Sequence, residues 1–210
     1  MIDDEASARA FVADRCDEEA LARLDQFVEL LRFENMRQNL VSAASLDCVW
    51  RRHTADSAQL LDHVPCETVP RWLDLGSGAG FPGLVISAMR PEWPVVLVES
   101  RKLRIEWLES AVDALQLVHC QVQGRRLETV PSMPAGVISA RAFASLPNLI
   151  ALSRRFSTND TVWLLPKGRS AAQEVADLSP ELRELFHVER SATDSNSGIV
   201  VGRVTGGKGR

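Results

Sequence analysis

The chain has 210 residues, of which 45% are hydrophobic and 25% charged, and its formal net charge is −4. This length predicts one full-sized domain, and the ordinary composition excludes a disordered or fibrous protein. No run approaches the roughly 18 consecutive apolar residues of a membrane helix, and the acidic start, Met1 to Glu5, is unlike the basic start of a signal peptide. The four cysteines form no C-x-x-C pair, which favours a reducing cytoplasm and argues against a metal site.

The negative charge lies mainly at the N-terminus. Nine acidic and three basic residues give positions 1–30 a net charge of −6, so positions 31–210 carry +2. Solvated helix faces account for most groups of basic residues, but several groups around one cleft would indicate an anionic partner. The acidic total therefore does not exclude RNA, although the small net charge predicts weak non-specific binding to it. The basic groups are Arg51-Arg52-His53, Arg101-Lys102-x-Arg104, Arg125-Arg126, Arg154-Arg155 and Lys167-Gly168-Arg169.

The first third of the chain has the pattern of helices. Asp17 is suited to cap a helix N-terminus, and apolar residues follow it at helical spacing: Ala20, Leu21, Leu24, Phe27, Val28 and Leu31. A second helix is predicted from about residue 46 to 61, with inward-facing Val49, Trp50, Ala58 and Leu61. We expect residues 1–65 to form a helical cap on the remainder.

From residue 71 onward, short apolar runs alternate with helical stretches. This alternation predicts a mostly parallel sheet with helices on both faces, and the continuous apolar run 95–98 predicts a strand buried on both sides. Residues 185–189 and 198–204 are predicted to form an antiparallel hairpin joined by the polar run 191–197. We expect residues 66–205 to form a single compact α/β unit and 206–210 a flexible tail. The predicted strands are 72–75, 95–98, 118–122, 137–140 and 162–165, and the predicted helices are 82–89, 103–115, 146–156 and 171–178.

A glycine-rich turn follows the first predicted strand, in the run Asp74-Leu75-Gly76-Ser77-Gly78-Ala79-Gly80-Phe81-Pro82-Gly83. Glycines let the backbone turn sharply and approach a ligand, and N–H groups at a helix start suit a carboxylate or phosphate. Phe81 occupies the place of the third glycine of the dinucleotide pattern G-x-G-x-x-G, and no lysine follows Gly83 as in a phosphate loop. The G-x-G-x-G spacing after an acidic residue resembles motif I of class I S-adenosylmethionine (SAM)-dependent methyltransferases.

Glu99 stands at the end of the second predicted strand. An acidic residue there can accept hydrogen bonds from both hydroxyls of a ribose. Because SAM and NAD both carry a ribose, Glu99 indicates a nucleoside ligand without choosing between them.

Further motifs resemble those of the RsmG (GidB) family over about residues 35–170. They are Asn39-Leu40-Val41-Ser42, Arg52-His53-x-x-Asp56-Ser57, the run 73–83, Glu99-Ser100-x-Lys102, Arg141-Ala142-Phe143-Ala144 and Lys167-Gly168. This family methylates N7 of one guanine in bacterial 16S ribosomal RNA. The resemblance implies a class I, Rossmann-like fold with an N-terminal helical cap and a C-terminal hairpin. It also implies SAM as cofactor, 16S rRNA or an assembling 30S particle as partner, and a cytoplasmic location.

The resemblance also implies particular site residues. Cofactor contacts are expected at Gly76, Phe81, the Leu127–Glu128 turn and Arg141, and the motif I pattern with Glu99 adds Asp74, Gly78, Gly80 and Glu99 itself. The candidates for RNA contacts are Arg52, Lys102, Arg104, Arg126 and Lys167. Arg141, just past the fourth predicted strand, could bind the SAM carboxylate, a phosphate or guanine O6.

Two further groups of residues are assigned structural roles. We interpret Arg52, His53, Asp56 and Ser57 as the link between the cap and the cofactor loop, since His53 and Asp56 are ordinary neighbours at helical spacing. Trp50, Trp72, Trp107 and Trp163 lie in apolar patterns and are expected in the core rather than stacked on bases.

Guanine N7 has an available lone pair at neutral pH, so its methylation needs positioning rather than a general base. We therefore expect no catalytic acid or base, and Arg141 as a substrate-orienting residue. Two alternatives remain: a small-molecule SAM-dependent methyltransferase, and a non-catalytic module that binds a nucleoside or the ribosome. A nicotinamide-dependent oxidoreductase is disfavoured by Phe81. A monomer without metal or membrane partner is expected.

Overall fold

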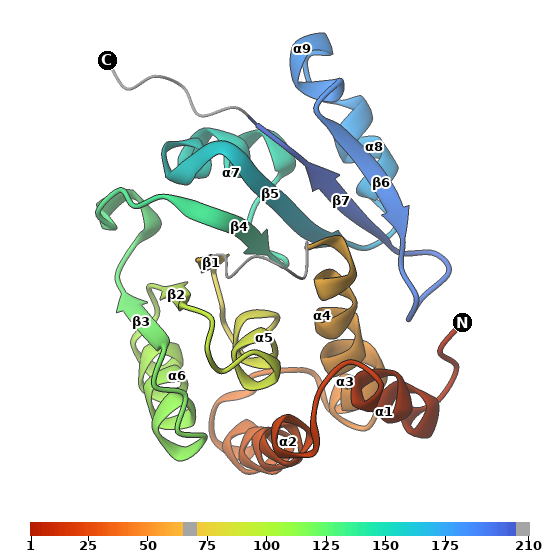
Figure 1. The fold of residues 1–210 in the computed structure, drawn as a ribbon, viewed down its shortest axis with the longest axis vertical. Coiled ribbons are helices and arrows are strands. Elements are labelled where there is room, and N and C mark those ends of the chain that lie inside the picture. The colour runs from red at the N-terminus through yellow and green to blue at the C-terminus, as the bar shows by residue number, and fades with distance from the viewer. Residues whose placement is uncertain (65–70, 205–210) are drawn as a thin grey trace.

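The computed structural model describes residues 1–64 and 71–204. Its centre is a seven-stranded sheet in the order β3-β2-β1-β4-β5-β7-β6 (Figure 1). The first five strands are parallel and the last two are antiparallel to their neighbours. The expected α/β class with a C-terminal hairpin is confirmed. The strands are β1 (Trp72–Leu75), β2 (Val95–Glu99), β3 (Cys120–Gly124), β4 (Ala135–Ala140), β5 (Ser157–Lys167), β6 (Phe186–Arg190) and β7 (Gly198–Gly202).

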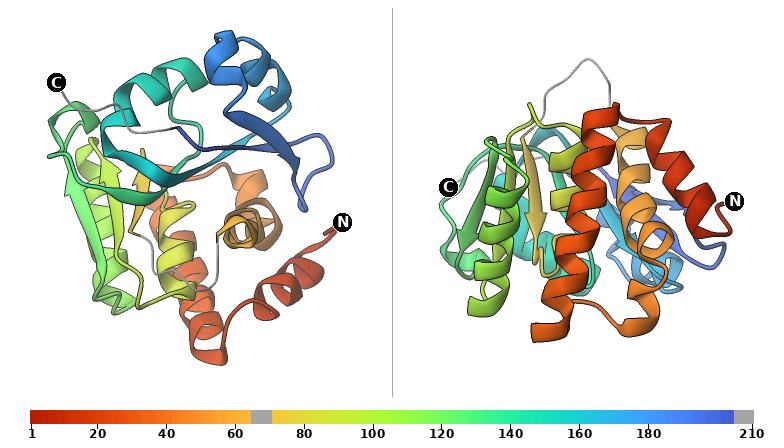
Figure 2. Two further views of the ribbon diagram at one scale, coloured as in Figure 1. Left: turned by 45° about the horizontal axis from the view of Figure 1, so that its top comes forward. Right: turned by 90° about the horizontal axis from the view of Figure 1, so that it is seen from below.

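Helices cover both faces of the sheet, as the views in Figures 1 and 2 show. One face packs against α1 (Glu5–Ala13), α2 (Glu18–Gln38), α5 (Gly83–Met89), α6 (Lys102–Ala114) and the segment 43–63. The other face packs against α7 (Leu146–Ser153), α8 (Ala171–Ala176) and α9 (Pro180–Arg183). Two short helical turns, η3 (Leu127–Thr129) and η4 (Arg154–Phe156), precede β4 and β5. Because α2 shares one hydrophobic cluster with α5 and α6, the N-terminal helices are part of the core of the α/β unit.

Helix α2 begins where the sequence predicts it. The Asp17 side chain accepts a hydrogen bond from the Ala20 N–H at 2.7 Å and so caps the helix. Leu24, Phe27 and Leu31 are fully buried, which confirms the predicted apolar face. Helix α1 is not among the predicted elements. It is capped by Asp4, whose side chain accepts from the Ser7 N–H.

The strands at the centre of the sheet are buried on both sides. Trp72 and Leu97 contribute to the cluster under α2 and α5, while Leu73 and Val96 contribute to the cluster under α7. The prediction of a doubly buried strand at 95–98 is thus confirmed. The four tryptophans predicted in the core (Trp50, Trp72, Trp107 and Trp163) are at most 8% exposed.

The prediction of one continuous helix over 46–61 is wrong, because this stretch is divided into short helical segments of different types. Helix α3 (Ala43–Leu46) stops early, and a π-helical turn, η1 (Trp50–Ala55), then leads into α4 (Asp56–Ala58) and the 3₁₀ turn η2 (Gln59–His63). The N–H groups of Trp50 and Arg51 donate to the Glu5 carboxylate, at 3.0 and 2.8 Å. A side chain of α1 therefore caps the second helical stretch, and local spacing could not predict this contact.

Two strands differ from their predicted ranges. The strand predicted at 118–122 lies at Cys120–Gly124 because Gln116 adopts a left-handed conformation (φ 54°) after α6 and Val118 turns into solvent, 82% exposed. Strand β5 starts at Ser157, five residues before its apolar part. The apolar pattern does not predict this first half because it is polar and largely exposed.

The hairpin loop 191–197 lies at the end of the sheet where the parallel strands finish. Gly198 at the start of β7 is opposite Lys167 at the end of β5, and the Ile2 N–H donates to the Ala192 carbonyl at 2.9 Å. The predicted tail 206–210 lies outside the described residues. Within residues 1–64 and 71–204, no helix has the length and apolarity to cross a membrane, and no three His, Cys, Asp or Glu side chains form a possible metal site.

Candidate active site

Three adjoining cavities lie where the parallel strands end. The Glu99 cavity, of about 210 Å³, is bounded by Gly76, the end of β2 and Leu127. The Asp56 cavity, of about 320 Å³, lies between Arg52–Asp56 on one side and the hairpin loop 191–197 with the start of β7 on the other. The Phe143 cavity, of about 460 Å³, lies between residues 141–145, 166–168 and Glu174. Ala142, two residues after the end of β4, lines all three and is therefore their meeting point.

The glycine turn has the backbone that its sequence predicts. Gly76, Gly78 and Gly80 have φ values of 68°, 54° and 102°, in the left-handed region that favours glycine. A Cβ on Gly76 would collide with the Phe143 ring, and one on Gly80 would collide with Leu84. Larger residues would fill the turn at both positions.

Asp74 lies fully buried beneath this turn. Its carboxylate accepts hydrogen bonds from the Ser139 hydroxyl at 2.7 Å and from the Gly83 N–H at 3.3 Å. Burial raises the pKa of Asp74, and these hydrogen bonds oppose the rise. The Gly83 N–H at the start of α5 therefore already has an acceptor within the protein, the Asp74 carboxylate.

Replacing Asp74 by alanine is expected to lower the free energy of unfolding by about 3 kcal/mol, because the Ser139 hydroxyl and Gly83 N–H lose their buried acceptor. Asp74→Asn keeps one carbonyl acceptor and should cost less. Urea unfolding of both variants measures the difference, and equal losses would contradict this supporting role.

Glu99 ends β2, lines its cavity and contacts the glycine turn directly. One carboxylate oxygen accepts from the Ser100 and Arg101 N–H groups, at 2.7 and 2.9 Å, and the other accepts from the Gly78 N–H at 3.1 Å. Since a carboxylate offers about four lone-pair positions, the second oxygen can still accept a ligand hydroxyl. The Glu99 side chain is thus fixed and only 4% exposed.

The predicted turn after β3 divides into a buried and an exposed residue. Leu127 is 4% exposed and lines the Glu99 cavity. Glu128 is exposed and lies 3.1 Å from Arg126 in an ion pair.

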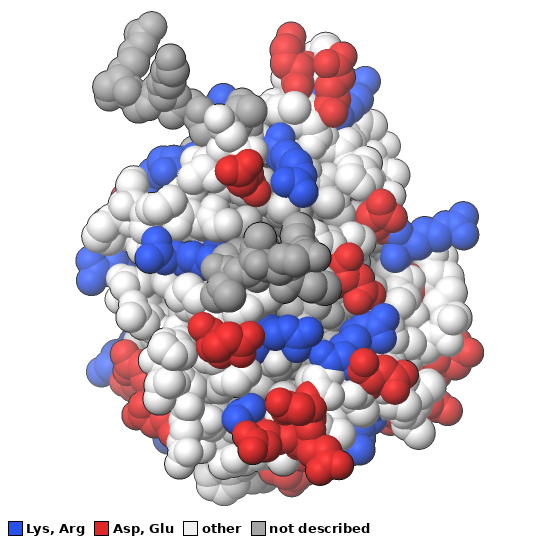
Figure 3. All heavy atoms as spheres, viewed as in Figure 1, with Lys and Arg blue, Asp and Glu red and all other residues white. Residues whose placement is uncertain are grey.

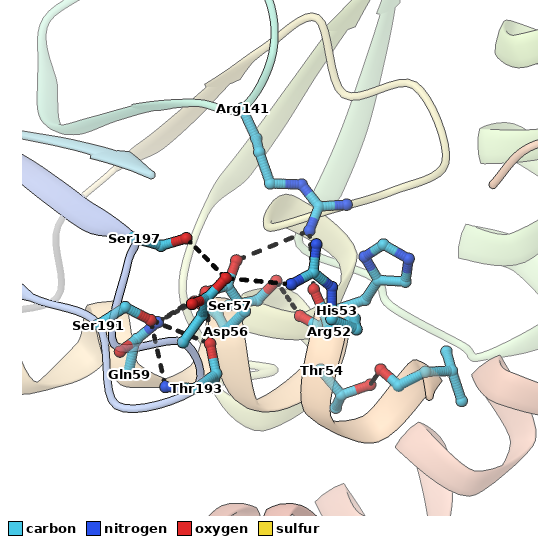
Figure 4. Close-up of polar contacts among 12 residues, drawn as sticks. Arg52, His53, Thr54, Asp56, Ser57, Gln59, Arg141, Ser191, Thr193 and Ser197 are labelled. Carbon is cyan, nitrogen blue, oxygen red and sulfur yellow. Dashed lines mark hydrogen bonds and ion pairs between the residues drawn. The ribbon is translucent and has the colours of Figure 1, made fainter. Parts of the chain in front are cut away.

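Arg141 follows β4 and lines the Asp56 cavity. Its side chain points toward Asp56 and Arg52 (Figure 4). Its Nη1 donates to the Arg52 carbonyl at 3.3 Å and lies 3.7 Å from Asp56 Oδ2. Its guanidinium lies 5.1 Å from the centre of the Phe81 ring, and the His53 ring stacks on Phe81 with centroids 4.7 Å apart. The predicted link between cap and cofactor loop is therefore a stack of three side chains, with Asp56 as the countercharge of Arg141.

The hairpin loop fixes Asp56 from the other side. Asp56 Oδ1 accepts from Gln59 Nε2 at 2.9 Å and from the Thr193 hydroxyl at 3.0 Å, and Asp194 pairs with Arg52 at 3.3 Å (Figure 4). Sequence analysis missed Thr193 and Asp194 because it treated 191–197 only as a connection. The antiparallel hairpin was the available signal, since it returns this loop to the ends of the parallel strands.

His53 is buried, and neither ring nitrogen has a hydrogen-bond partner among the described residues. Burial, together with the positive charges of Arg141 and Arg52, lowers the pKa of His53 to about 3. The imidazole is therefore uncharged near neutral pH.

This burial predicts a pH effect on stability. Below pH 6.5 the unfolded chain protonates His53 while the folded chain stays neutral, so stability is lost as pH falls from 6.5 toward 3. From pH 7 to pH 5 the loss from this residue should be about 2 kcal/mol. His53→Phe, which retains a ring against Phe81, should remove that part of the pH dependence of unfolding in urea. Parallel pH profiles of wild type and variant would contradict the prediction.

The five candidates for RNA contacts fall into two groups. Arg52, Lys102 and Arg126 are exposed, at 51, 88 and 75% of their side-chain surface. Arg104 instead donates to the Asn39 carbonyl at 2.9 Å, and Lys167 is 9% exposed, with its Nζ 2.8 Å from both the Ala144 carbonyl and Glu174. Arg52, Arg141 and Lys167 line the Asp56 cavity together, so separate basic groups do meet at one site. On the face in Figure 3, basic and acidic side chains are interspersed.

Comparisons with known proteins identify the family of the chain. A family model described as GidB, rRNA small subunit methyltransferase G, matches residues 20–196. Ribosomal RNA small subunit methyltransferase G of Erythrobacter litoralis is 61% identical over 203 residues, covering 97% of this chain and 98% of that protein. Its namesake from Novosphingobium aromaticivorans is 51% identical over 208 residues, covering 97% and 90%.

Solved structures agree in fold at low identity. A SAM-dependent methyltransferase from Aquifex aeolicus has a TM-score of 0.58 at 13% identity, covering 80% of this chain and 96% of that chain. A mutant of MtNAS in complex with S-adenosylmethionine has a TM-score of 0.56 at 14% identity, covering 95% and 77%. The fold is that of class I SAM-dependent methyltransferases. The chain belongs to the rRNA small subunit methyltransferase G (GidB) family.

Proposed function

We propose that this protein transfers a methyl group from SAM to N7 of one guanine in 16S rRNA, acting as a cytoplasmic monomer on free rRNA or an assembling 30S particle. The observation that carries the proposal is the meeting of three cavities at Ala142, two residues after the end of β4, in a member of this family. In this proposal residues 1–65 are the helical cap, which contributes Asp56 to the cofactor site, and residues 66–205 supply the other cofactor contacts.

The adenosine part of SAM fits the Glu99 cavity. Glu99 keeps one acceptor position for a ribose hydroxyl, and Leu127 offers an apolar wall for the adenine. Gly76 has no side chain between the turn and the Phe143 ring. Gly78, Gly80 and Phe81 shape the turn, and the exposed Glu128 follows at the rim. Asp74 supports the turn from below.

The amino-acid end of SAM is a zwitterion and fits the Asp56 cavity. Arg141 offers guanidinium donors to a carboxylate, and Asp56 offers a carboxylate to an ammonium group. His53 stays uncharged beside them and has unsatisfied ring nitrogens. Oppositely charged groups 3.7 Å apart suit an amino acid better than a phosphate, which would face Asp56.

The chemistry asks little of titratable side chains. SAM supplies an electrophilic methyl group, so the N7 lone pair forms the new N–C bond while the electrons of the S–C bond remain on sulfur. The protein must hold the base in line with that bond, and positioning alone can contribute about 7–11 kcal/mol. The exposed Arg52, Lys102 and Arg126 are suited to hold RNA phosphates around the site, whereas Arg104 and Lys167 act through the loops they tie.

Mass analysis of 16S rRNA fragments tests the proposal. Unmethylated 30S particles and free 16S rRNA, incubated with the protein and SAM, should gain one methyl group at one guanine, and 7-methylguanine should appear after hydrolysis. SAM binding without methylation of either RNA would favour the non-catalytic module or a small-molecule methyltransferase. A salt titration of RNA binding should give a shallow slope, because few phosphates are neutralised.

A further inference from the structure

We propose that the Phe143 cavity receives the target guanine and that the Phe143 ring stacks on its base. The inference rests on the proposed function and deepens it by naming the subsite for the base.

Phe143 is an aromatic ring left partly exposed at the reaction centre. Its side chain is 36% exposed, and among the described large apolar residues with such exposure, it alone lines one of the three cavities. It borders both its own cavity and the Glu99 cavity, and its ring lies against Gly76. An exposed ring beside a cofactor site is a suitable platform for an unstacked base.

The loop that carries Phe143 is held in place by side chains of β5 and α8. Ala142 adopts a left-handed conformation with φ of 52°, and its two neighbours share the Phe143 cavity while Arg141 also lines the Asp56 cavity and Phe143 the Glu99 cavity. Lys167 Nζ donates to the Ala144 carbonyl at 2.8 Å, and Glu174 accepts from the Leu146 N–H at 3.0 Å. Lys167 and Glu174 also pair with each other at 2.8 Å. A ring on such a loop is positioned before the substrate arrives, which lowers the entropy cost of binding.

The other two cavities suit the base less well. The Glu99 cavity has the partners of a nucleoside of the cofactor, and the Asp56 cavity has the paired charges of an amino acid. The Phe143 cavity is the largest of the three and shares Ala142 and Phe143 with the Glu99 cavity, so a base in it borders the cofactor. Arg141 and Lys167 also line this cavity, so its walls combine one aromatic ring with charged side chains.

The test compares Phe143→Ala, Phe143→Tyr and, as the matched control, Phe33→Ala. Phe33 is a 63% exposed aromatic on α2, away from the three cavities. Phe143→Ala should lower kcat/KM for unmethylated 30S particles about 10- to 100-fold, with the loss mainly in KM, because one stacking contact is removed. Phe143→Tyr and Phe33→Ala should stay within about twofold of the wild type. Calorimetry should give all three variants the SAM affinity of the wild type.

Several results would overturn the inference. Full activity of Phe143→Ala would exclude stacking, and weaker SAM binding by the same factor as the loss of kcat/KM would assign the ring to the cofactor. Low activity of Phe143→Tyr with intact SAM binding would show that an aromatic face is not what matters. If the wild-type protein itself methylates no 30S particle or rRNA, the proposed function fails. If the wild type is active and Phe143→Ala equals Phe33→Ala, only the present inference fails.

Discussion

Replacement of Gly76 by arginine is expected to abolish SAM binding. The left-handed backbone at Gly76 costs a non-glycine residue about 1–3 kcal/mol, and the first atom of any side chain would collide with the Phe143 ring. The remaining atoms of an arginine would then occupy the Glu99 cavity, where we place adenosine. Isothermal titration calorimetry with SAM measures the loss.

A second arginine variant separates this local effect from added charge. Val118→Arg introduces the same residue at a position that is 82% exposed, in the turn before β3 and outside the three cavities. It should bind SAM like the wild type. Urea unfolding establishes whether Gly76→Arg is folded. A folded Gly76→Arg protein with SAM affinity within about tenfold of the wild type, a difference of about 1.4 kcal/mol, would contradict the assignment of the Glu99 cavity.

The sequence predicts those parts of the fold that depend on neighbouring residues. The strand before Gly76, the turn itself and the cap of α2 at Asp17 depend on residues close in sequence, so hydrophobic spacing and capping chemistry define them. The irregular stretch at 43–63 depends on Glu5, which accepts hydrogen bonds from the N–H groups of Trp50 and Arg51, 45 and 46 positions away. Nothing in the local pattern marks that contact.

The same distinction applies to the site. Gly76, Glu99 and Arg141 follow the ends of predicted strands, and parallel strands bring such positions to one edge. Lys167 and Glu99 are both charged in the sequence. Only the structure shows that the lysine Nζ already donates to Ala144 and Glu174, whereas Glu99 keeps one acceptor position toward its cavity. Thr193 reaches Asp56 across 137 positions, a contact that depends on the pairing of β5 with β7.

Arg141→Ala is expected to weaken SAM binding about 10- to 100-fold, because the carboxylate of the amino-acid end loses charged hydrogen bonds. Methyl transfer to 16S rRNA should fall with it. The ligand 5′-methylthioadenosine lacks the amino-acid end and should bind Arg141→Ala and the wild type equally. The comparison of the two ligands therefore separates a direct contact from a general distortion, which would weaken both.

Two further variants complete this test. Arg37→Ala removes an arginine that is 71% exposed and forms an ion pair with Glu34, and it should change neither affinity. Arg141→Lys keeps the charge near Asp56 but loses the forked guanidinium, so its SAM affinity should fall between those of wild type and alanine variant. Because alanine leaves Asp56 without its countercharge, unfolding of each variant is measured alongside. Equal weakening of SAM and 5′-methylthioadenosine by Arg141→Ala would assign Arg141 to the structure of the site. Unchanged SAM affinity with lost rRNA methylation would instead assign its guanidinium to the guanine.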